Sequence, residues 1–315
     1  MQSAATPTHR TIIIGAGPGG SSAAIYLSRF NHEALIFDAP EKVPGRTRYA
    51  LEIENVLGFN GSTPGPSYLK QVHKQLESFG IERHEELVTH VTREADGTFF
   101  VTTDKPARYK AGYVIVAVGV ADLLPDVPRI EEFFGHSVYP CPTCNWYQTK
   151  DRRTAIIAND DKGINTALMF NAMQPGSALY VIPDRPRPYF SEEMRKKAAQ
   201  ASVEIVECPL VELNSEKGML ESVTLATGEK LELEILYTVL GVKRQDLFLD
   251  TESMQVERNE EGYLEVDFKT METSVENLFA VGPCNCGPDQ VMVAAGQGVV
   301  AAMEVHERVL AGMGI

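Results

Sequence analysis

The feature that most constrains this chain is a glycine-rich turn near its N-terminus. Residues 11–14 form a short apolar run, and residues 15–20 read Gly-Ala-Gly-Pro-Gly-Gly. Residues 21–29 then carry apolar side chains at helical spacing. A second apolar run, residues 34–37, ends at Asp38. This order of strand, turn, helix, strand and acid is typical of a dinucleotide-binding unit on a parallel sheet.

Each glycine of the turn has a separate task in such a unit. Gly15 allows the tight turn, Gly17 lets the backbone approach a pyrophosphate, and Gly20 allows the helix to pack closely on the strand. The N-terminal end of the helix attracts phosphate charge. Asp38 accepts hydrogen bonds from the adenosine ribose. The complete unit therefore predicts a bound nucleotide cofactor.

A pair of cysteines, Cys141 and Cys144, is the second feature that carries chemistry. Two cysteines at this spacing can close a small disulfide ring, and a thiolate at the first position is often stabilised by a helix start or a cation. The spacing also fits half of a zinc site, or two buried thiols. No second C-x-x-C or H-x-x-x-H completes the four ligands of structural zinc, so no metal is expected. The nucleotide fingerprint before the pair and a second Rossmann-like segment after it favour a redox dithiol.

Composition limits the other classes of function. The chain has 315 residues and a formal net charge of −14, which argues against nucleic acid and an anionic membrane surface as partners. No apolar run approaches the ~18 residues of a membrane span. Residues 1–10 lack the apolar stretch of a signal peptide, and the five cysteines do not form a secreted disulfide framework. We therefore expect a cytoplasmic protein.

A second nucleotide unit is predicted to keep its fold and lose its chemistry. The strand at residues 154–158 is followed by Asn159, Asp160 and Asp161 in place of a glycine turn. Two carboxylates at this place would repel a pyrophosphate. A helix at residues 166–173 and a strand at 178–182 are still expected.

The other elements follow from periodicity and turn residues. We expect a loop at 41–65, a helix at 68–79, two strands within 86–103, strands at 113–119, 203–206, 220–226, 235–239 and 277–282, and a long helix at 289–310. Cys284 and Cys286 are interpreted either as a second redox pair or, preferably, as small packing residues.

Taken together, these motifs resemble the low-molecular-weight thioredoxin reductase family of flavoproteins, over nearly the whole chain. The matching pieces are the 15–20 fingerprint with Asp38, the Glu54-Asn55 loop, the strand end at 116–119, the Cys141/Cys144 pair between two Rossmann units, the strand at 277–282 and the helix segment 294–298.

The resemblance implies an α/β fold of two Rossmann-like, doubly wound, three-layer domains, the second inserted into the first. The expected bounds are 1–118 with 245–315 for a discontinuous FAD-binding domain, and 119–244 for the central domain. It also implies a homodimer in which electrons pass from NADPH to FAD, to the disulfide and on to thioredoxin. In the family the second cysteine, here Cys144, lies nearer the flavin, and Cys141 attacks the partner disulfide.

The same resemblance supplies the expected cofactor-binding residues. They are Gly15, Gly17, Pro18, Gly19, Gly20, Asp38, Ala39, Arg46, Asn55, Val88, Ala117, Gly119, Gly282, Gln290 and Val291.

The chain departs from the family pattern at four places. The second glycine motif is absent, and residues 183–187 replace the His-Arg-Arg run that holds the NADPH phosphate. Asn145 replaces an acid after the second cysteine, and Gly282-Pro283 replaces Gly-Asp beside the flavin. The first two departures resemble the NADPH-independent subgroup, the ferredoxin-dependent or deeply rooted thioredoxin reductases.

Two alternatives remain beside such a reductase. A dithiol oxidase would use O2 as acceptor and close a disulfide in a small-molecule product, but those oxidases usually keep the acid that Asn145 replaces. A flavin-binding redox sensor would show no turnover.

Overall fold

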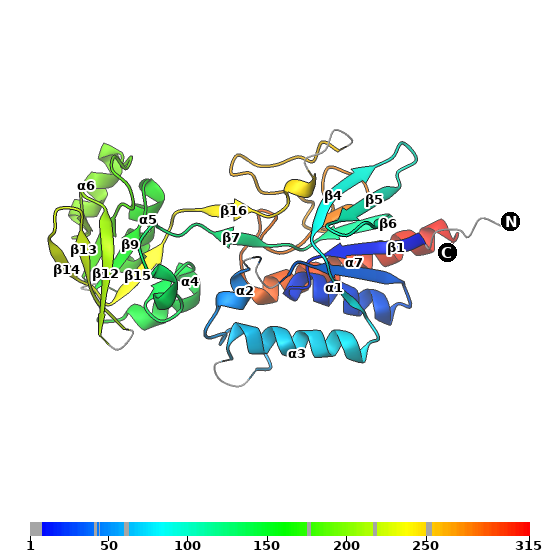
Figure 1. Ribbon diagram of the computed structural model, residues 1–315. Coiled ribbons are helices and arrows are strands. Elements are labelled where there is room, and N and C mark those ends of the chain that lie inside the picture. The colour runs from blue at the N-terminus through cyan, green and yellow to red at the C-terminus, as the bar shows by residue number, and fades with distance from the viewer. Residues whose placement is uncertain are drawn as a thin grey trace. The chain divides into compact units, whose positions relative to one another are not determined.

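The computed structural model describes residues 8–40, 43, 45–59, 63–174, 178–216, 219–249 and 254–315. The chain divides into two compact units (Figure 1). One comprises Met1–Ala121 with Lys243–Ile315, and the other comprises Asp122–Val242. In the sequence the second unit is thus inserted into the first. Both are of the Rossmann type, which confirms the predicted fold class.

The first unit is built on one mixed sheet in the order β3-β2-β1-β6-β5-β4, and β17 also pairs with β6. Strands β3, β2, β1, β6 and β17 run parallel, and β4 and β5 are antiparallel. The bounds are β1 Thr8–Ile14, β2 Ala34–Asp38, β3 Arg83–Glu85, β4 Val88–Arg93, β5 Phe99–Thr103, β6 Arg108–Val116 and β17 Leu278–Ala280.

Alternate residues of β1 enter two different cores, which explains its unbroken apolar run. Ile13 packs in a core with helix residues such as Leu27 and Val305. Ile12 packs on the other face of the sheet with Phe99. The helices of this unit are α1 Pro18–Arg29, α2 Arg46–Tyr49, α3 Gly65–Ser78 and α7 Val291–Gly312, with a 3₁₀ turn at Leu247–Leu249. Figure 1 shows α1 and α3 beside the parallel strands, and β4 and β5 at the edge of the same sheet beyond β6.

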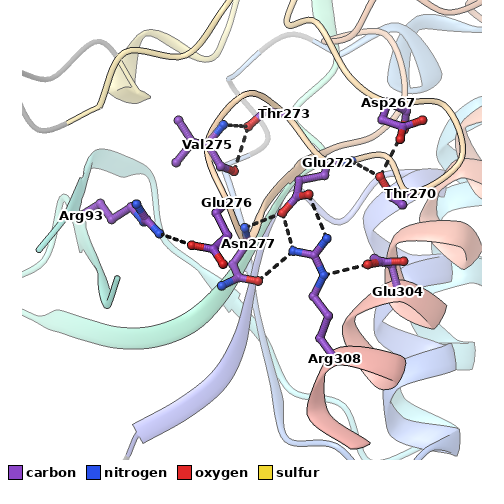
Figure 2. Close-up of polar contacts among 10 residues, drawn as sticks. All are labelled: Arg93, Asp267, Thr270, Glu272, Thr273, Val275, Glu276, Asn277, Glu304 and Arg308. Carbon is purple, nitrogen blue, oxygen red and sulfur yellow. Dashed lines mark hydrogen bonds and ion pairs between the residues drawn. The ribbon is translucent and has the colours of Figure 1, made fainter. Parts of the chain in front are cut away.

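A charged network fastens the end of α7 to the chain before β17 (Figure 2). The Arg308 guanidinium pairs with both carboxylate oxygens of Glu272. It also donates to Asn277 Oδ1 at 2.9 Å and to Glu304 Oε1 at 2.7 Å. The backbone N–H of Asn277 donates to Glu272 Oε1 at 2.7 Å. Every partner lies on α7 or just before β17, so the network fixes α7 on the sheet.

The second unit has a parallel sheet in the order β11-β10-β9-β15-β8 and a separate antiparallel sheet in the order β12-β13-β14. The strands are β8 Val138–Tyr139, β9 Thr154–Ile157, β10 Leu179–Ile182, β11 Glu204–Ile205, β12 Leu210–Glu216, β13 Met219–Leu225, β14 Lys230–Glu232 and β15 Ile235–Thr238. The helices are α4 Pro142–Asn145, α5 Asp161–Met173 and α6 Glu192–Gln200, with 3₁₀ turns at Ile130–Phe133 and Trp146–Thr149. The connecting strands β7 Val120–Asp122 and β16 Val242–Arg244 pair with each other.

Several sequence-based expectations about helices need correction. The helices expected at 21–29 and 68–79 each begin three residues earlier, at Pro18 and Gly65. The predicted loop at 41–65 contains the short helix α2. The helix expected at 166–173 begins five residues earlier, at Asp161, because Asp160 caps it. The last helix begins at Val291 rather than at Asp289. Within the described residues, no helix is both long and apolar enough to cross a membrane.

Candidate functional site: a nucleotide pocket and a C-x-x-C disulfide

The turn between β1 and α1 can form only with glycine at two positions. Gly15 has φ +105°, and a Cβ there would lie 2.4 Å from the Ala117 carbonyl oxygen. A Cβ on Gly20 would lie 1.9 Å from the Gly15 carbonyl oxygen. Gly17, the N-cap of α1, differs because a Cβ there would meet open space. Gly17 therefore leaves room for a ligand at the start of the helix.

The Ala16 peptide inside this turn is held from three directions. Its N–H donates to Asp38 Oδ1 at 3.1 Å. Its carbonyl accepts the Ser21 hydroxyl at 2.9 Å and His73 Nε2 at 3.1 Å. Burial lowers the pKa of His73, which favours the neutral ring whose Nε2–H donates to this carbonyl. The turn is thus fixed by its own chain before any ligand binds.

Asp38, the expected ribose acceptor, is held by two arginines. Its Oδ2 accepts Arg48 Nη2 at 3.3 Å and Arg83 Nη1 at 3.1 Å. No sequence pattern gives Arg48, Arg83 or His73 a role, because their partners lie far away in sequence or in a stretch without periodicity. Only the fold brings them together.

A pocket in the first unit gathers most of the predicted cofactor-binding residues. Those that line it are Gly15, Gly17, Pro18, Gly19, Asp38, Ala39, Arg46, Val88, Ala117, Gly119 and Gly282. Its lining also includes Arg48, His73 and Glu86. Exposed backbone at a helix start, space at Gly17 and an oriented acid beside it are what an adenine dinucleotide requires. The residues present therefore fit FAD.

Four predicted cofactor-binding residues do not line this pocket. Gly20 lies under the turn, against Gly15. Asn55 Nδ2 donates to Gln290 Oε1 at 2.8 Å, just before α7. Val291 packs against a small apolar cluster around Tyr68. These last three residues join the 50s loop to the start of α7.

Cys141 and Cys144 form a disulfide in the second unit, with their Cα atoms 5.4 Å apart. Cys141 is the N-cap of α4 and Pro142 opens the helix. Both cysteines are partly exposed, so a thiol from another molecule can reach their disulfide. Cys141 therefore lies at a helix start, where a thiolate is stabilised.

The residues after the disulfide divide into a packing residue and an exposed one. The Trp146 ring packs on Phe170, with ring centroids 4.5 Å apart. Phe170 in turn contacts the fully buried Tyr237. Tyr147 is 60% exposed. Trp146 thus anchors the C-x-x-C segment to the core, while Tyr147 faces solvent.

The turn between β9 and α5 repeats the backbone plan of the first turn with different side chains. The Ala158 N–H donates to Ile182 O at 3.0 Å, as Gly15 N–H donates to Phe37 O at 2.7 Å. Asp160 is the N-cap of α5, and its Oδ1 accepts the Lys162 N–H at 3.0 Å.

Only the third glycine of the motif keeps its role in this second turn. A Cβ on Gly163 would lie 2.1 Å from Ala158 Cβ, so α5 still packs closely on β9. At the position of the second glycine, Asp160 now fills the helix start.

The loop after β10 closes over the same turn. The Tyr189 N–H donates to the Asn159 carbonyl at 2.8 Å, and the Ser191 N–H donates to Asp161 Oδ1 at 2.8 Å. Asn159 and Asp184 are joined by two hydrogen bonds. Both carboxylates of the turn therefore bind the protein's own backbone.

The other cysteines show no second disulfide. Cys208, Cys284 and Cys286 are free. Burial raises the pKa of Cys284 to about 12, and its thiol donates to the Val281 and Val116 carbonyls. Cys286 is exposed. This geometry agrees with a packing role for Cys284.

The nucleotide pocket lies in one Rossmann unit and the Cys141/Cys144 disulfide lies in the other. Transfer of two electrons between a bound dinucleotide and a pair of thiols requires both of these sites. Proteins so equipped are FAD-dependent disulfide oxidoreductases. The family model for pyridine nucleotide-disulphide oxidoreductases matches residues 9–298, and this chain belongs to that family. Its cofactor is FAD, and within the family it is of the thioredoxin reductase type.

Individual relatives agree with this assignment. NADPH-dependent thioredoxin reductase 3 of Arabidopsis thaliana is 30% identical over 313 residues, covering 94% of this chain and 57% of that protein. Thioredoxin reductase of Mycolicibacterium smegmatis is 28% identical over 304 residues, covering 95% of this chain and 96% of that protein. The structure of thioredoxin reductase from Giardia duodenalis superposes on this one with a TM-score of 0.85 at 25% sequence identity. The match covers 97% of this chain and 100% of that chain.

Proposed function

We propose that this protein passes electrons between FAD and the Cys141/Cys144 disulfide and on to thioredoxin or a similar dithiol, with a donor other than NADPH, such as ferredoxin. The observation that carries the choice of donor is the capped turn at Asp160. The pocket residues around Gly17 and Asp38 would hold FAD, which would supply a store for two electrons.

The thiol chemistry follows from the place of the two cysteines. Reduction of their disulfide takes up two electrons and two protons and yields two thiols. The Cys141 thiolate, at the start of α4, attacks one sulfur of the partner disulfide and releases the other as a thiolate. Cys144 then attacks Cys141, which restores the internal disulfide and frees the reduced partner. Asn145 carries no proton to donate as an acid, so water or another group protonates the leaving thiolate.

The turn before α5 opposes NADPH binding through its negative charge and through a backbone N–H that is already occupied. A diphosphate needs free backbone N–H groups at a helix start. At α5 the Lys162 N–H is already bound to Asp160, and Asp161 adds a second carboxylate. Two such charges near a diphosphate, at an effective dielectric near 20, cost on the order of a few kcal/mol. That corresponds to a loss of affinity of about a hundredfold or more. The name of the Arabidopsis relative points the other way, so a direct test is needed.

The test is anaerobic stopped-flow mixing of the oxidised holoprotein with three donors: NADPH, reduced ferredoxin and a small dithiol. We expect flavin bleaching with ferredoxin, reduction of added thioredoxin, and no bleaching within seconds at sub-millimolar NADPH. Rapid bleaching with NADPH would return the protein to the NADPH-dependent reductases.

The alternatives appear as other outcomes of the same experiment. Bleaching by a dithiol, followed in air by peroxide release, would indicate a dithiol oxidase. Bleaching without reduction of any disulfide partner would indicate a sensor. The homodimer, which the resemblance implies, and the cytoplasmic location, which composition and the N-terminal segment predict, remain predictions.

A further inference from the structure

Arg48 joins a strand end, a loop and a short helix beside the nucleotide pocket. From α2, its Nη1 donates to the Pro40 carbonyl at 3.2 Å and to the Val43 carbonyl at 3.3 Å. Its Nη2 donates to the Ala39 carbonyl and to Asp38 Oδ2, both at 3.3 Å. One guanidinium thus binds four acceptors within residues 38–43. Its side chain is 24% exposed, so these bonds are partly shielded from water.

The same contacts fix the direction of the Asp38 carboxylate. Oδ1 accepts the Ala16 N–H of the glycine-rich turn, and Oδ2 accepts hydrogen bonds from Arg48 and Arg83. A carboxylate bound on both oxygens does not rotate freely, and Asp38 is 8% exposed. The fold therefore fixes the directions of its remaining lone pairs. The Asp38 carboxylate is already oriented before a ribose binds.

The neighbouring arginine extends this arrangement to the other end of α2. Arg46 pairs with Asp289, two residues before the start of α7. The four-residue helix is thus held to the end of β2 by Arg48 and to the start of α7 by Arg46. Both arginines line the pocket, as do Ala39 and Val43. A change at Arg48 would loosen the pocket wall next to Asp38 and leave the glycine turn in place.

We propose that Arg48 is a positioning residue for the adenosine half of FAD: it holds Ala39 and Val43 in the pocket wall and orients Asp38 toward the ribose. The proposal rests on FAD binding in this pocket and is independent of the electron donor. Arg83 has the smaller share, because only its contact with Asp38 supports the site. Lysine cannot replace Arg48, since one ammonium group does not reproduce a planar fork bound to four acceptors.

The experiment measures FAD affinity of the full-length apoprotein by fluorescence titration for Arg48→Gln, Arg48→Lys and Arg83→Gln. Arg129→Gln is the matched control, because Arg129 is exposed and pairs only with Glu132, three residues away, among described residues. Loss of hydrogen bonds to a charged group predicts FAD binding about tenfold to a hundredfold weaker for Arg48→Gln. Arg48→Lys should lie between Arg48→Gln and the unchanged protein, and Arg83→Gln should lose less than about tenfold.

Two further readouts separate positioning from general damage. ADP, which carries the adenosine half alone, should compete with FAD for the apoprotein. Its affinity for Arg48→Gln should be reduced by the same factor as the affinity for FAD. At saturating FAD, the visible absorption spectrum of the bound flavin should be unchanged, because Arg48 lies at the adenosine end.

Equal FAD affinity in Arg48→Gln and Arg129→Gln would overturn the proposal, as would an altered flavin spectrum at saturation. If Arg48→Gln fails to fold, Arg48→Lys decides by the same criteria. Failure of the unchanged protein to bind FAD would instead refute the cofactor site itself.

Discussion

Asp160 stands at the start of α5 in the second unit where Gly17 stands at the start of α1 in the first. Both are N-caps of the helix that follows a central parallel strand. Gly17 leaves open space, whereas the carboxylate of Asp160 accepts the Lys162 N–H. One backbone plan thus gives an open helix start in one unit and a self-capped start in the other.

The first prediction concerns the cap itself. Asp160→Ala should destabilise the protein by about 1 kcal/mol, because the Lys162 N–H loses its acceptor. Urea unfolding followed by far-UV circular dichroism measures the change. Asp126→Ala, at an exposed position of the same unit, is the control and should shift stability by less than about 0.5 kcal/mol. Equal stabilities for the two variants would show that the cap contributes nothing.

The second prediction compares two glycines of the first turn: Gly17, which faces open space, and Gly20, which packs against the backbone. Gly20→Ala should destabilise the apoprotein by about 3 kcal/mol, because the new Cβ would lie 1.9 Å from the Gly15 carbonyl oxygen. Gly17→Ala should leave apoprotein stability nearly unchanged, since its Cβ meets open space.

Cofactor content should distinguish the same two variants. Purified Gly17→Ala should carry less FAD, because the methyl group occupies space that the pyrophosphate needs. Thermal unfolding of the apoproteins and flavin absorbance of the purified proteins give the two quantities. A Gly17→Ala protein with full FAD content would mean that the diphosphate lies elsewhere.

The sequence was most informative where one residue type has one physical task. Apolar runs marked the buried strands, and the glycines marked the first turn, because a side chain at Gly15 or Gly20 would collide with the backbone. The start of α5 was misplaced because the glycine pattern was absent, although Asp160 and Asp161 are themselves ordinary signals of a helix start. The pairing of Arg48 with Asp38 could not be read, because no local pattern specifies the direction of a long side chain in an aperiodic loop.

The third prediction assigns disulfide exchange to one pair of cysteines. Cys141→Ser and Cys144→Ser should each abolish turnover with a disulfide partner and leave FAD bound, because the pair and the pocket lie in different units. Cys286→Ser, at an exposed free cysteine, is the control and should keep activity. Titration of the thiols released from the disulfide partner measures turnover, and flavin absorbance measures bound FAD. Full activity in a protein that lacks Cys141 and Cys144 would move the chemistry to another site.

The last prediction is a pH dependence that originates in the network of Figure 2. Burial alone would raise the pKa of Glu272, but hydrogen bonds from Arg308 and the Asn277 N–H outweigh it, and the pKa lies below its ordinary value of 4.5. A carboxyl group whose pKa is lowered by folding adds stability above its unfolded pKa. That stability is lost as pH falls through the folded pKa.

Glu272→Gln should therefore destabilise the protein at pH 6 by about 1.5 kcal/mol, the lower end for charged hydrogen bonds, because both side chains are partly exposed. The difference from the unchanged protein should shrink as pH falls below about 4.5, because Glu272 is protonated first in the unfolded state and then, as pH falls through the lowered pKa, in the folded state. Urea unfolding at a series of pH values measures it. Glu94→Gln, which breaks a half-exposed pair with Arg108, should cost less than about 1 kcal/mol. A Glu272→Gln effect that stayed constant from pH 6 to pH 3, or that matched Glu94→Gln, would show that the Arg308 network does not depend on the Glu272 charge.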